Sequence, residues 1–249
     1  MSLQLYKGDC LQVMKSLPEK SIDCFVCDLP FGQIACSWDS CIDLEVFWSE
    51  VERLMKHDRV PIIMFCTTKF GFSLIQSKRD WFRYDLIWEK PNAVGFMSAN
   101  KMPLRAHEMI YIFSKQSSYY ERIDQEGDYK RAGGGRSKMI VYGTNIPNIN
   151  PDNTGKRCVR SVLRHGACKQ KDQHPTQKPI SLYKWLVERY CPIDGTMLDP
   201  TAGSFNSCLA AVDVDRNAIG IEQDEYYFKR AVDKFSEVYN RCLPTEKSS

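Results

Sequence analysis

Residues 196–222 read TMLDPTAGSFNSCLAAVDVDRNAIGIE. Two short apolar runs, Thr196–Leu198 and Ala218–Glu222, flank a segment, Ser204–Val212, in which apolar residues recur at helical spacing. A strand, a helix and a second strand in this order are typical of a parallel sheet covered by helices. Gly203, in the turn after the first strand, allows the backbone to approach a ligand closely. This unit therefore predicts an α/β domain with a ligand at the turn.

The same alternation continues toward both ends of the chain. Short apolar runs predict strands, and apolar residues that recur at helical spacing predict helices. Together they predict a doubly wound, mostly parallel sheet, in which ligands bind beyond the carboxyl ends of the strands. The expected strands are Ile22–Asp28, Pro61–Cys66, Tyr84–Trp88 and Met109–Phe113, and the expected helices are Asp43–His57, Phe70–Lys78, Ile180–Tyr190 and Glu225–Tyr239.

The composition fits an intracellular globular protein. The chain has 249 residues, enough for one large domain or a domain with an insertion, and no apolar run is long enough to span a membrane. We expect no secretory signal at the N-terminus. The 11 cysteines are odd in number and scattered, which indicates a reducing, cytoplasmic location rather than a disulfide framework. Cys24 and Cys27 lie inside an apolar run, so we expect buried thiols and no metal site.

The middle of the chain has a different character. Between Asn92 and Asp172, glycines, asparagines and basic residues replace the periodic pattern, which predicts an inserted, loop-rich segment. The expected organisation is one domain in two halves, 1–91 and 173–249, separated by the insertion 92–172. Its basic residues suit contacts to phosphates, although a solvated basic loop explains the charge equally well. These basic residues are Lys130, Arg131, Arg136, Lys138, Lys156, Arg157, Arg160, Arg164, Lys169 and Lys171, and Lys178 follows shortly after.

A candidate catalytic motif, Asp28-Leu29-Pro30-Phe31-Gly32, follows the first buried strand. An aromatic amine is a poor nucleophile because its lone pair is delocalised into the ring. The Asp28 carboxylate and the Leu29 carbonyl, both accepting hydrogen bonds from such an amine, would localise that lone pair on nitrogen. Pro30 restricts the backbone, and Phe31 offers a flat face for stacking on an extruded base. The alternative is a strand followed by an ordinary Pro-Gly turn with a buried Phe.

A candidate nucleoside site combines the turn Asp199–Asn206 with Glu222. The helix after the turn offers free N–H groups at its start. Glu222 ends the next strand about 20 residues later, where an acidic residue can accept hydrogen bonds from both hydroxyls of a ribose. The turn lacks the several glycines of a dinucleotide-binding loop, and an ordinary strand-to-helix turn is the alternative.

These stretches resemble the motifs of the DNA amino-methyltransferases that act on adenine N6 or cytosine N4. Asp28–Gly32 resembles their D-P-P-Y-G motif, Asp199–Asn206 their D-P-F-x-G-S-G-T cofactor loop, and His174–Pro179 their H-P-T-Q-K-P segment. Gly8–Cys10 resembles the opening stretch of the family. The catalytic motif precedes the variable segment and the cofactor loop comes last, which resembles the permuted β class. Cys36–Asp39, with its Trp-Asp pair, is similar to the bacteriophage-type adenine enzymes.

The resemblance implies a seven-stranded sheet, S-adenosylmethionine as the methyl donor, and DNA as the substrate, with 92–172 as the target-recognition region. It implies direct transfer to a flipped base, catalysed by Asp28, Leu29, Pro30 and Phe31. The cofactor-binding residues that it implies are Asp9, Cys10, Asp28, Lys178, Asp199, Thr201, Ala202, Gly203, Ser204, Phe205, Asn206, Glu222 and Gln223. No metal is implied.

Three departures from the family pattern leave alternatives open. Leu29 replaces the commoner Pro, Phe31 replaces Tyr, and Phe205-Asn206 replaces Gly-Thr in the cofactor loop. The acid at position 28 is more similar to the adenine N6 enzymes, because cytosine N4 enzymes often carry Ser there. Site-specific adenine N6 methylation, as in restriction-modification systems, is therefore expected. The alternatives are cytosine N4 methylation and a catalytically inactive DNA-binding relative, and both a monomer and a homodimer fit the sequence.

Overall fold

The computed structural model describes residues 1–30, 42–126, 155–166 and 177–238. The chain divides into two compact units. The larger comprises Met1–Glu121 and Ser161–Ser249, and the smaller is Arg122–Arg160. Within the smaller unit, β6 (Gln125–Glu126) pairs antiparallel with β7 (Lys156–Arg157).

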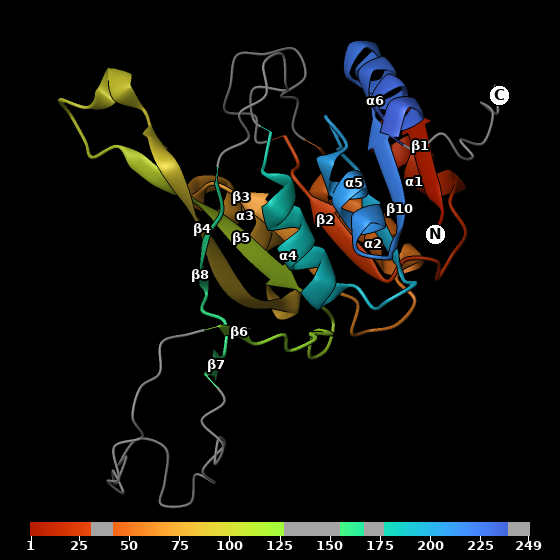
Figure 1. Ribbon diagram of the computed structural model, residues 1–249. Coiled ribbons are helices and arrows are strands. Elements are labelled where there is room, and N and C mark those ends of the chain that lie inside the picture. The colour runs from red at the N-terminus through yellow and green to blue at the C-terminus, as the bar shows by residue number, and fades with distance from the viewer. Residues whose placement is uncertain (31–41, 127–154, 167–176, 239–249) are drawn as a thin grey trace, which may run out of the picture. The chain divides into compact units, whose positions relative to one another are not determined.

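The larger unit is built on one eight-stranded sheet with the order β1-β10-β9-β2-β3-β5-β4-β8 (Figure 1). The first five strands in this order are parallel to one another, whereas β5 is antiparallel to both β3 and β4. This confirms the doubly wound, mostly parallel sheet. The strands are β1 (Leu3–Lys7), β2 (Cys24–Cys27), β3 (Ile62–Cys66), β4 (Phe82–Val94), β5 (Arg105–Phe113), β8 (Val162–Arg164), β9 (Thr196–Asp199) and β10 (Asn217–Glu222).

Two features of the sheet differ from the sequence expectation. The resemblance implied seven strands, and β8 is an eighth, paired parallel with β4. Three residues are too few to show a periodic pattern. The strands β4 and β5 are also much longer than the expected Tyr84–Trp88 and Met109–Phe113, because they continue as an exposed hairpin. Exposure on both faces removes the apolar alternation by which a strand is recognised.

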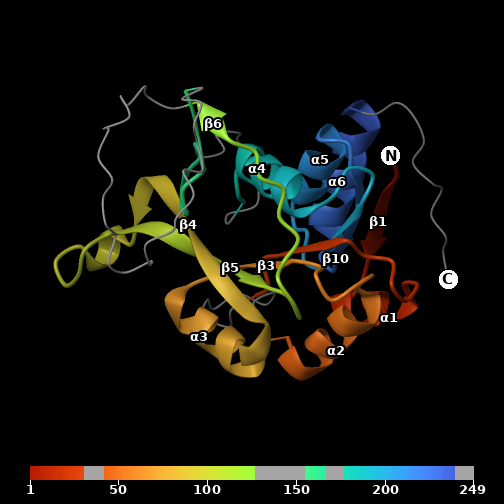
Figure 2. The same cartoon turned by 90° about the horizontal axis from the view of Figure 1, so that it is seen from below.

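Helices cover both faces of the sheet (Figure 2). Apolar side chains of α1, α2 and α3 share one buried cluster, and those of α4, α5 and α6 share the other. The helices are α1 (Cys10–Ser16), α2 (Leu44–Leu54), α3 (Thr68–Ser77), α4 (Ile180–Tyr190), α5 (Asn206–Asp213) and α6 (Glu225–Val238), with 3-10 turns η1 (Arg79–Trp81) and η2 (Phe96–Ser98). None of these described helices is long and apolar enough to cross a membrane.

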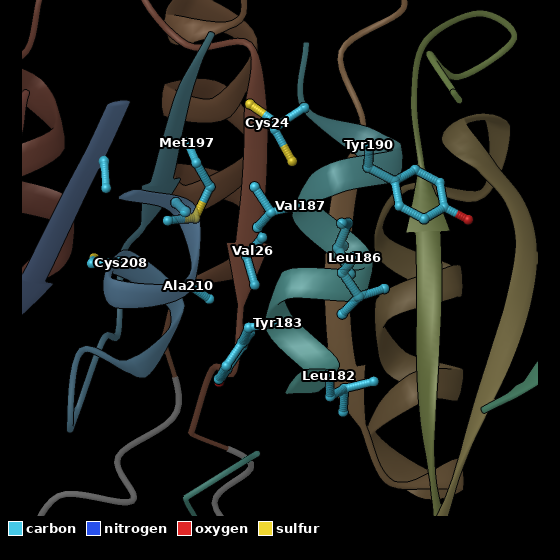
Figure 3. Close-up of a cluster of buried hydrophobic side chains, with 14 of the residues drawn as sticks. Cys24, Val26, Leu182, Tyr183, Leu186, Val187, Tyr190, Met197, Cys208 and Ala210 are labelled. Atoms are coloured by element: carbon cyan, nitrogen blue, oxygen red, sulfur yellow. The ribbon is translucent and has the colours of Figure 1, made fainter. Parts of the chain in front are cut away.

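The central strand β2 shows why its sequence is apolar throughout. Cys24 and Val26 belong to the cluster under α4, and Phe25 and Cys27 belong to the opposite cluster. Figure 3 shows Cys24 and Val26 beside the α4 residue Val187. The thiols of Cys24 and Cys27 are completely buried, as the sequence predicted, and burial raises the pKa of each well above the usual range. A strand covered on both faces places every side chain in the core.

Candidate active site at the carboxyl ends of the parallel strands

Four segments that are distant in sequence meet at one rim of the sheet. Gly8 follows β1, Asp28 follows β2, Asp199 ends β9 and Glu222 ends β10. The registers align these ends, because Lys7 pairs with Glu222, Gly220 with Asp199, and Phe25 with Leu198. The order β1-β10-β9-β2 makes the four segments neighbours. The catalytic motif and the cofactor loop therefore lie side by side although about 170 residues separate them.

Glu222 occupies the centre of this rim. Its carboxylate accepts hydrogen bonds from Gly203 N at 2.8 Å and from Asp224 N at 2.7 Å, and its carbonyl accepts one from Gly8 N at 3.0 Å. Burial raises the pKa of the Glu222 carboxyl. An ionised carboxylate offers about four acceptor positions, so these bonds leave acceptor capacity for a ligand hydroxyl. Gln223 beside it is exposed.

The turn after β9 is held by the protein itself. Ala202 N donates to Ile221 O at 2.8 Å, and Gly203 has a φ of 52°, which a glycine adopts without strain. Asp199 accepts from Thr201 N at 3.0 Å and from the Ser207 hydroxyl. These hydrogen bonds hold the turn against the carboxyl ends of β9 and β10.

The side chains of two cofactor-loop residues, Phe205 and Asn206, are buried and contact other parts of the protein. Phe205 is fully buried in the core, where a Cβ on Gly220 would lie 2.6 Å from its ring. Asn206 is also buried. Its Nδ2 donates to Lys178 O at 3.2 Å, and its Oδ1 accepts from Lys234 Nζ at 3.0 Å. At these positions the departure from Gly-Thr therefore serves packing at the start of α5, where Asn206 links Lys178 to Lys234 of α6.

The rim fits the nucleoside and amino-acid ends of S-adenosylmethionine. Thr201 Oγ1 is buried and makes no hydrogen bond with the described residues, so it is a polar atom ready for a ligand. Ala202 is buried and Ser204 is partly exposed beside it. On the opposite side of Glu222, Asp9 caps α1 by accepting from Gln12 N at 3.0 Å. Burial, together with the nearby Asp9 charge, raises the pKa of Cys10 to about 12, which keeps this thiol neutral.

Asp28 belongs to a chain of four charges that the sequence did not predict. Lys178 Nζ forms an ion pair with Asp28 Oδ2 and lies 3.5 Å from Glu108 Oε2, and Lys90 pairs with the other oxygen of Glu108. The Lys178 side chain is only 4% exposed. Burial alone lowers its pKa, but Asp28 and Glu108 reverse this, so that the pKa of Lys178 is raised. We call Asp28, Lys178, Glu108 and Lys90 the charge chain.

The remaining residues of the predicted catalytic motif lie only partly within the described residues. Leu29 is buried and Pro30 is partly exposed at the rim. Phe31, the segment Cys36–Asp39 and His174 lie outside the described residues. Gln177, the first described residue of the H-P-T-Q-K-P segment, leads directly into Lys178. No group of three or more metal-binding side chains occurs in the described parts of the chain.

The Asp199 carboxyl gives the site a measurable pH dependence. Burial raises its pKa from 3.8 to about 7, and the charges of Asp28 and Glu222 add to this. An acid with a raised pKa stabilises the fold at low pH, and this contribution is lost as the pH rises through the folded-state pKa. The difference between these two pKa values corresponds to at most about 4 kcal/mol of unfolding free energy. Between pH 5 and 8, wild-type protein should therefore lose unfolding free energy relative to Asp199→Asn. Urea unfolding of both at each pH checks this, and parallel pH profiles would contradict it.

Comparison with known proteins identifies the family. The model of the N6/N4 DNA methylase family, described as DNA methylase, matches residues 22–233. DNA adenine methyltransferase YhdJ from Escherichia coli is 26% identical over 89% of this chain and 79% of its own length. The solved M1.HpyAVI–SAM complex has a TM-score of 0.61 at 17% identity, over 93% of this chain and 98% of that one. The cytosine-N4-specific PvuII DNA methyltransferase has a TM-score of 0.66 at 17% identity, over 97% and 92%.

The two structures support the fold, and the family match extends from the first buried strand into the last helix. That range contains both the acid-Leu-Pro motif after β2 and the turn after β9, which the sheet brings to one rim. On this match, the chain belongs to the N6/N4 DNA methylase family.

Proposed function

We propose that this protein methylates N6 of adenine in DNA at a specific site. Its family membership supports the coarser statement, a DNA amino-methyltransferase that uses S-adenosylmethionine. One observation carries the proposal at the level of residues. The Asp28 carboxylate lies at the end of β2, beside the Asp199 turn of β9 and one strand further from Glu222. A target base and a nucleoside cofactor can therefore meet at the same rim.

The residues that would hold the cofactor follow from their positions. Glu222 would accept hydrogen bonds from the ribose hydroxyls, with Gln223 at its exposed side. Asp9 and Cys10 would border the adenine, where a neutral thiol suits an uncharged ring. The turn from Asp199 to Ser204 would hold the methionine end, with Thr201 Oγ1 as a polar contact. When bound, S-adenosylmethionine supplies a methyl group activated by a sulfonium.

The remaining residues would prepare the base. Asp28 would accept one hydrogen bond from the target amine, and the carbonyl of Leu29 would accept the other, which localises the nitrogen lone pair. Pro30 restricts the backbone that presents this carbonyl. Phe31 is proposed as the stacking face for the everted base. This arrangement relies on positioning and needs no covalent intermediate between enzyme and base. Residues 92–172 are proposed as the region that selects the sequence.

Two observations favour adenine over cytosine. The motif begins with Asp28, as in the adenine N6 enzymes that it resembles, and the relative YhdJ is named an adenine methyltransferase. The fold match to the cytosine-N4-specific PvuII enzyme is the observation that favours cytosine N4 methylation as the second candidate. Both bases present an exocyclic amine, so the same carboxylate and carbonyl would serve either reaction.

Nucleoside analysis separates the two reactions. Unmethylated DNA is incubated with the protein and S-adenosylmethionine, digested to nucleosides and analysed by mass spectrometry. We expect N6-methyladenine, and sequencing of the methylated DNA should place it in one recurring site. N4-methylcytosine without N6-methyladenine would contradict the proposal. Salt-sensitive DNA binding without any methyl transfer would instead indicate a DNA-binding relative that has lost catalysis.

A further inference from the structure

The β4–β5 hairpin extends beyond the rim that carries Asp28. The last pair between β3 and β5 is Cys66 with Met109, whereas pairing between β4 and β5 continues to Val94 with Arg105. Because β5 is antiparallel to β3 and β4, the hairpin leaves the sheet at the carboxyl end of β3. Figures 1 and 2 both show it (yellow) projecting past the remaining strands. From Ile87 to Val94 it advances by roughly 20 Å at the usual strand rise.

The tip of this hairpin is apolar and exposed. Phe96 is 81% exposed, Met97 is 95% exposed and Met102 is 60% exposed. Val94 at the end of β4 and Leu104 just before β5 are exposed as well. Large apolar side chains gathered on one exposed element mark an interaction site rather than ordinary surface.

The positive charge around the tip indicates what kind of partner would bind there. Residues 91–107 contain Lys101 and Arg105 and no aspartate or glutamate. The basic Lys101 and Arg105 are exposed beside the apolar tip. A surface of this kind attracts a polyanion, and cations combined with apolar wedges are how proteins unstack a base step. Two copies of the same cationic tip would repel each other, so DNA fits this surface better than a second copy of the chain.

The base of the hairpin is tied to the proposed catalytic residue. Glu108, at the point where β5 returns to the sheet, lies 3.5 Å from Lys178 Nζ, and Lys178 pairs with Asp28. On the other strand, Lys90 pairs with Glu108. These ion pairs therefore fix the base of the hairpin relative to the Asp28 carboxylate. The tip lies further from the sheet. DNA that presents a base to Asp28 would lie along the hairpin.

We propose that the hairpin tip enters the DNA duplex beside the target, and that Phe96 and Met97 insert at the base step from which the target base is everted. This inference rests on the proposed function and adds to it the element that stabilises the everted state. Eversion requires unpairing and unstacking, which cost a few kcal/mol. An apolar side chain in the vacated space offsets part of this cost.

The test compares Phe96→Ala/Met97→Ala with wild-type protein on two duplexes. One carries the matched site found by sequencing, and the other carries a mismatch at the target pair, which lowers the cost of eversion. On the matched duplex, the kcat/KM of the variant should be at least about tenfold lower than that of wild-type protein. On the mismatched duplex it should recover to within about threefold of wild type. The fluorescence rise of 2-aminopurine at the target position should be lost in the variant on the matched duplex only.

Two further variants separate wedging from simple binding. Ile193→Ala removes an exposed apolar side chain at the amino end of β9, on the rim opposite to Asp28, and should match wild type. Lys101→Ala/Arg105→Ala should weaken binding equally on both duplexes. It should also reduce the slope of the logarithm of the binding constant against the logarithm of the salt concentration by about one for each basic residue removed.

Three outcomes would overturn the proposal that the hairpin tip is a wedge. One is wild-type activity of Phe96→Ala/Met97→Ala on the matched duplex. Another is an equal loss on matched and mismatched duplexes, which indicates a binding or assembly role. The third is a fall from dimer to monomer in sedimentation, which would assign the tip to a second copy. Failure of the proposed function is separate, because it is read from wild-type protein as the absence of N6-methyladenine. If the product is N4-methylcytosine, the same comparison is made at the target cytosine.

Discussion

Replacing Asp28 by alanine should lower the single-turnover rate of methyl transfer by up to about a thousandfold and leave S-adenosylmethionine affinity nearly unchanged. In the proposed mechanism the carboxylate is an acceptor for the target amine, and lost preorganised contacts at a reacting group typically cost this much. Asp28 is the only carboxylate of the catalytic motif. Its side chain is 21% exposed, so a base can reach it. Rapid-quench measurement at saturating cofactor and DNA gives the rate, and calorimetry gives the cofactor affinity.

The matched control is Glu222→Gln, which changes a carboxylate at the same rim with almost no change in shape. Glu222 is proposed to hold the ribose, so this variant should weaken cofactor binding by about tenfold and largely recover its rate at saturating cofactor. Asp28→Ala leaves Lys178 with Glu108 as a partner, so its loss of unfolding free energy should be smaller than the roughly 3–5 kcal/mol typical of a buried charge without a partner. A full transfer rate in Asp28→Ala would refute the catalytic assignment. An equal defect in cofactor binding for both variants would refute the division of roles.

The sequence predicted the parts of the fold in which burial is complete. The strands β2 and β3 are buried at every position, and each appeared as an uninterrupted apolar run. The strand-helix-strand unit around Gly203 was equally clear, since β9 and β10 are almost entirely buried. Parallel strands then brought Asp28, Asp199 and Glu222 to one rim, because their carboxyl ends coincide.

The sequence could not predict features that depend on pairing direction. Glu108 lies at the amino half of β5 and would belong to the opposite rim in a parallel sheet. Because β5 is antiparallel to β3, Glu108 instead lies at the rim of Asp28 and meets Lys178 there. A weak signal was present, since Lys90 and Glu108 are charged residues next to predicted strands. Only the three-dimensional pairing shows that they face each other.

The cofactor loop shows a second limit. A motif resemblance assigns roles to positions, whereas side-chain direction depends on packing. Phe205 and Asn206 occupy positions that align with the family loop, yet the ring of Phe205 enters the core and Asn206 links Lys178, which precedes α4, to Lys234 of α6. Phe205 also has a φ of 56°, a left-handed conformation that is rare for a bulky residue and that no motif resemblance predicts.

Lys178 is the residue at which the family resemblance and the structure suggest different roles, and Lys178→Met should decide between them. The resemblance implies a contact with the cofactor. In the structure its ammonium lies between Asp28 and Glu108, which suggests a positioning residue for Asp28. Removing one partner of a buried ion pair typically costs about 3–5 kcal/mol, since a charge is left uncompensated. We therefore expect a large fall in unfolding free energy, a lower rate of transfer and an unchanged cofactor affinity.

The pH dependence of this loss identifies its origin. In wild-type protein, burial alone would raise the pKa of Glu108, but Lys178 and Lys90 together hold it below its usual value. Its contribution to stability is therefore present above the ordinary carboxyl pKa and is lost as the pH falls through the lowered pKa. Without Lys178, Asp28 and Glu108 lose the cation that they share at pH 8, although Glu108 keeps Lys90, whereas at low pH both carboxylates bind protons. The difference in unfolding free energy between Lys178→Met and wild type should accordingly shrink from pH 8 to pH 4.

A double-mutant cycle completes the test. Glu108→Gln removes one of the two carboxylates that Lys178 compensates, so Lys178→Met/Glu108→Gln should be more stable at pH 8 than the sum of the single changes predicts. Its transfer rate should stay low, because Asp28 remains without the ammonium that orients it. If Lys178→Met instead raises the dissociation constant of S-adenosylmethionine and loses the same stability at every pH, the ammonium serves the cofactor. In that case the charge chain would have no part in orienting the catalytic carboxylate.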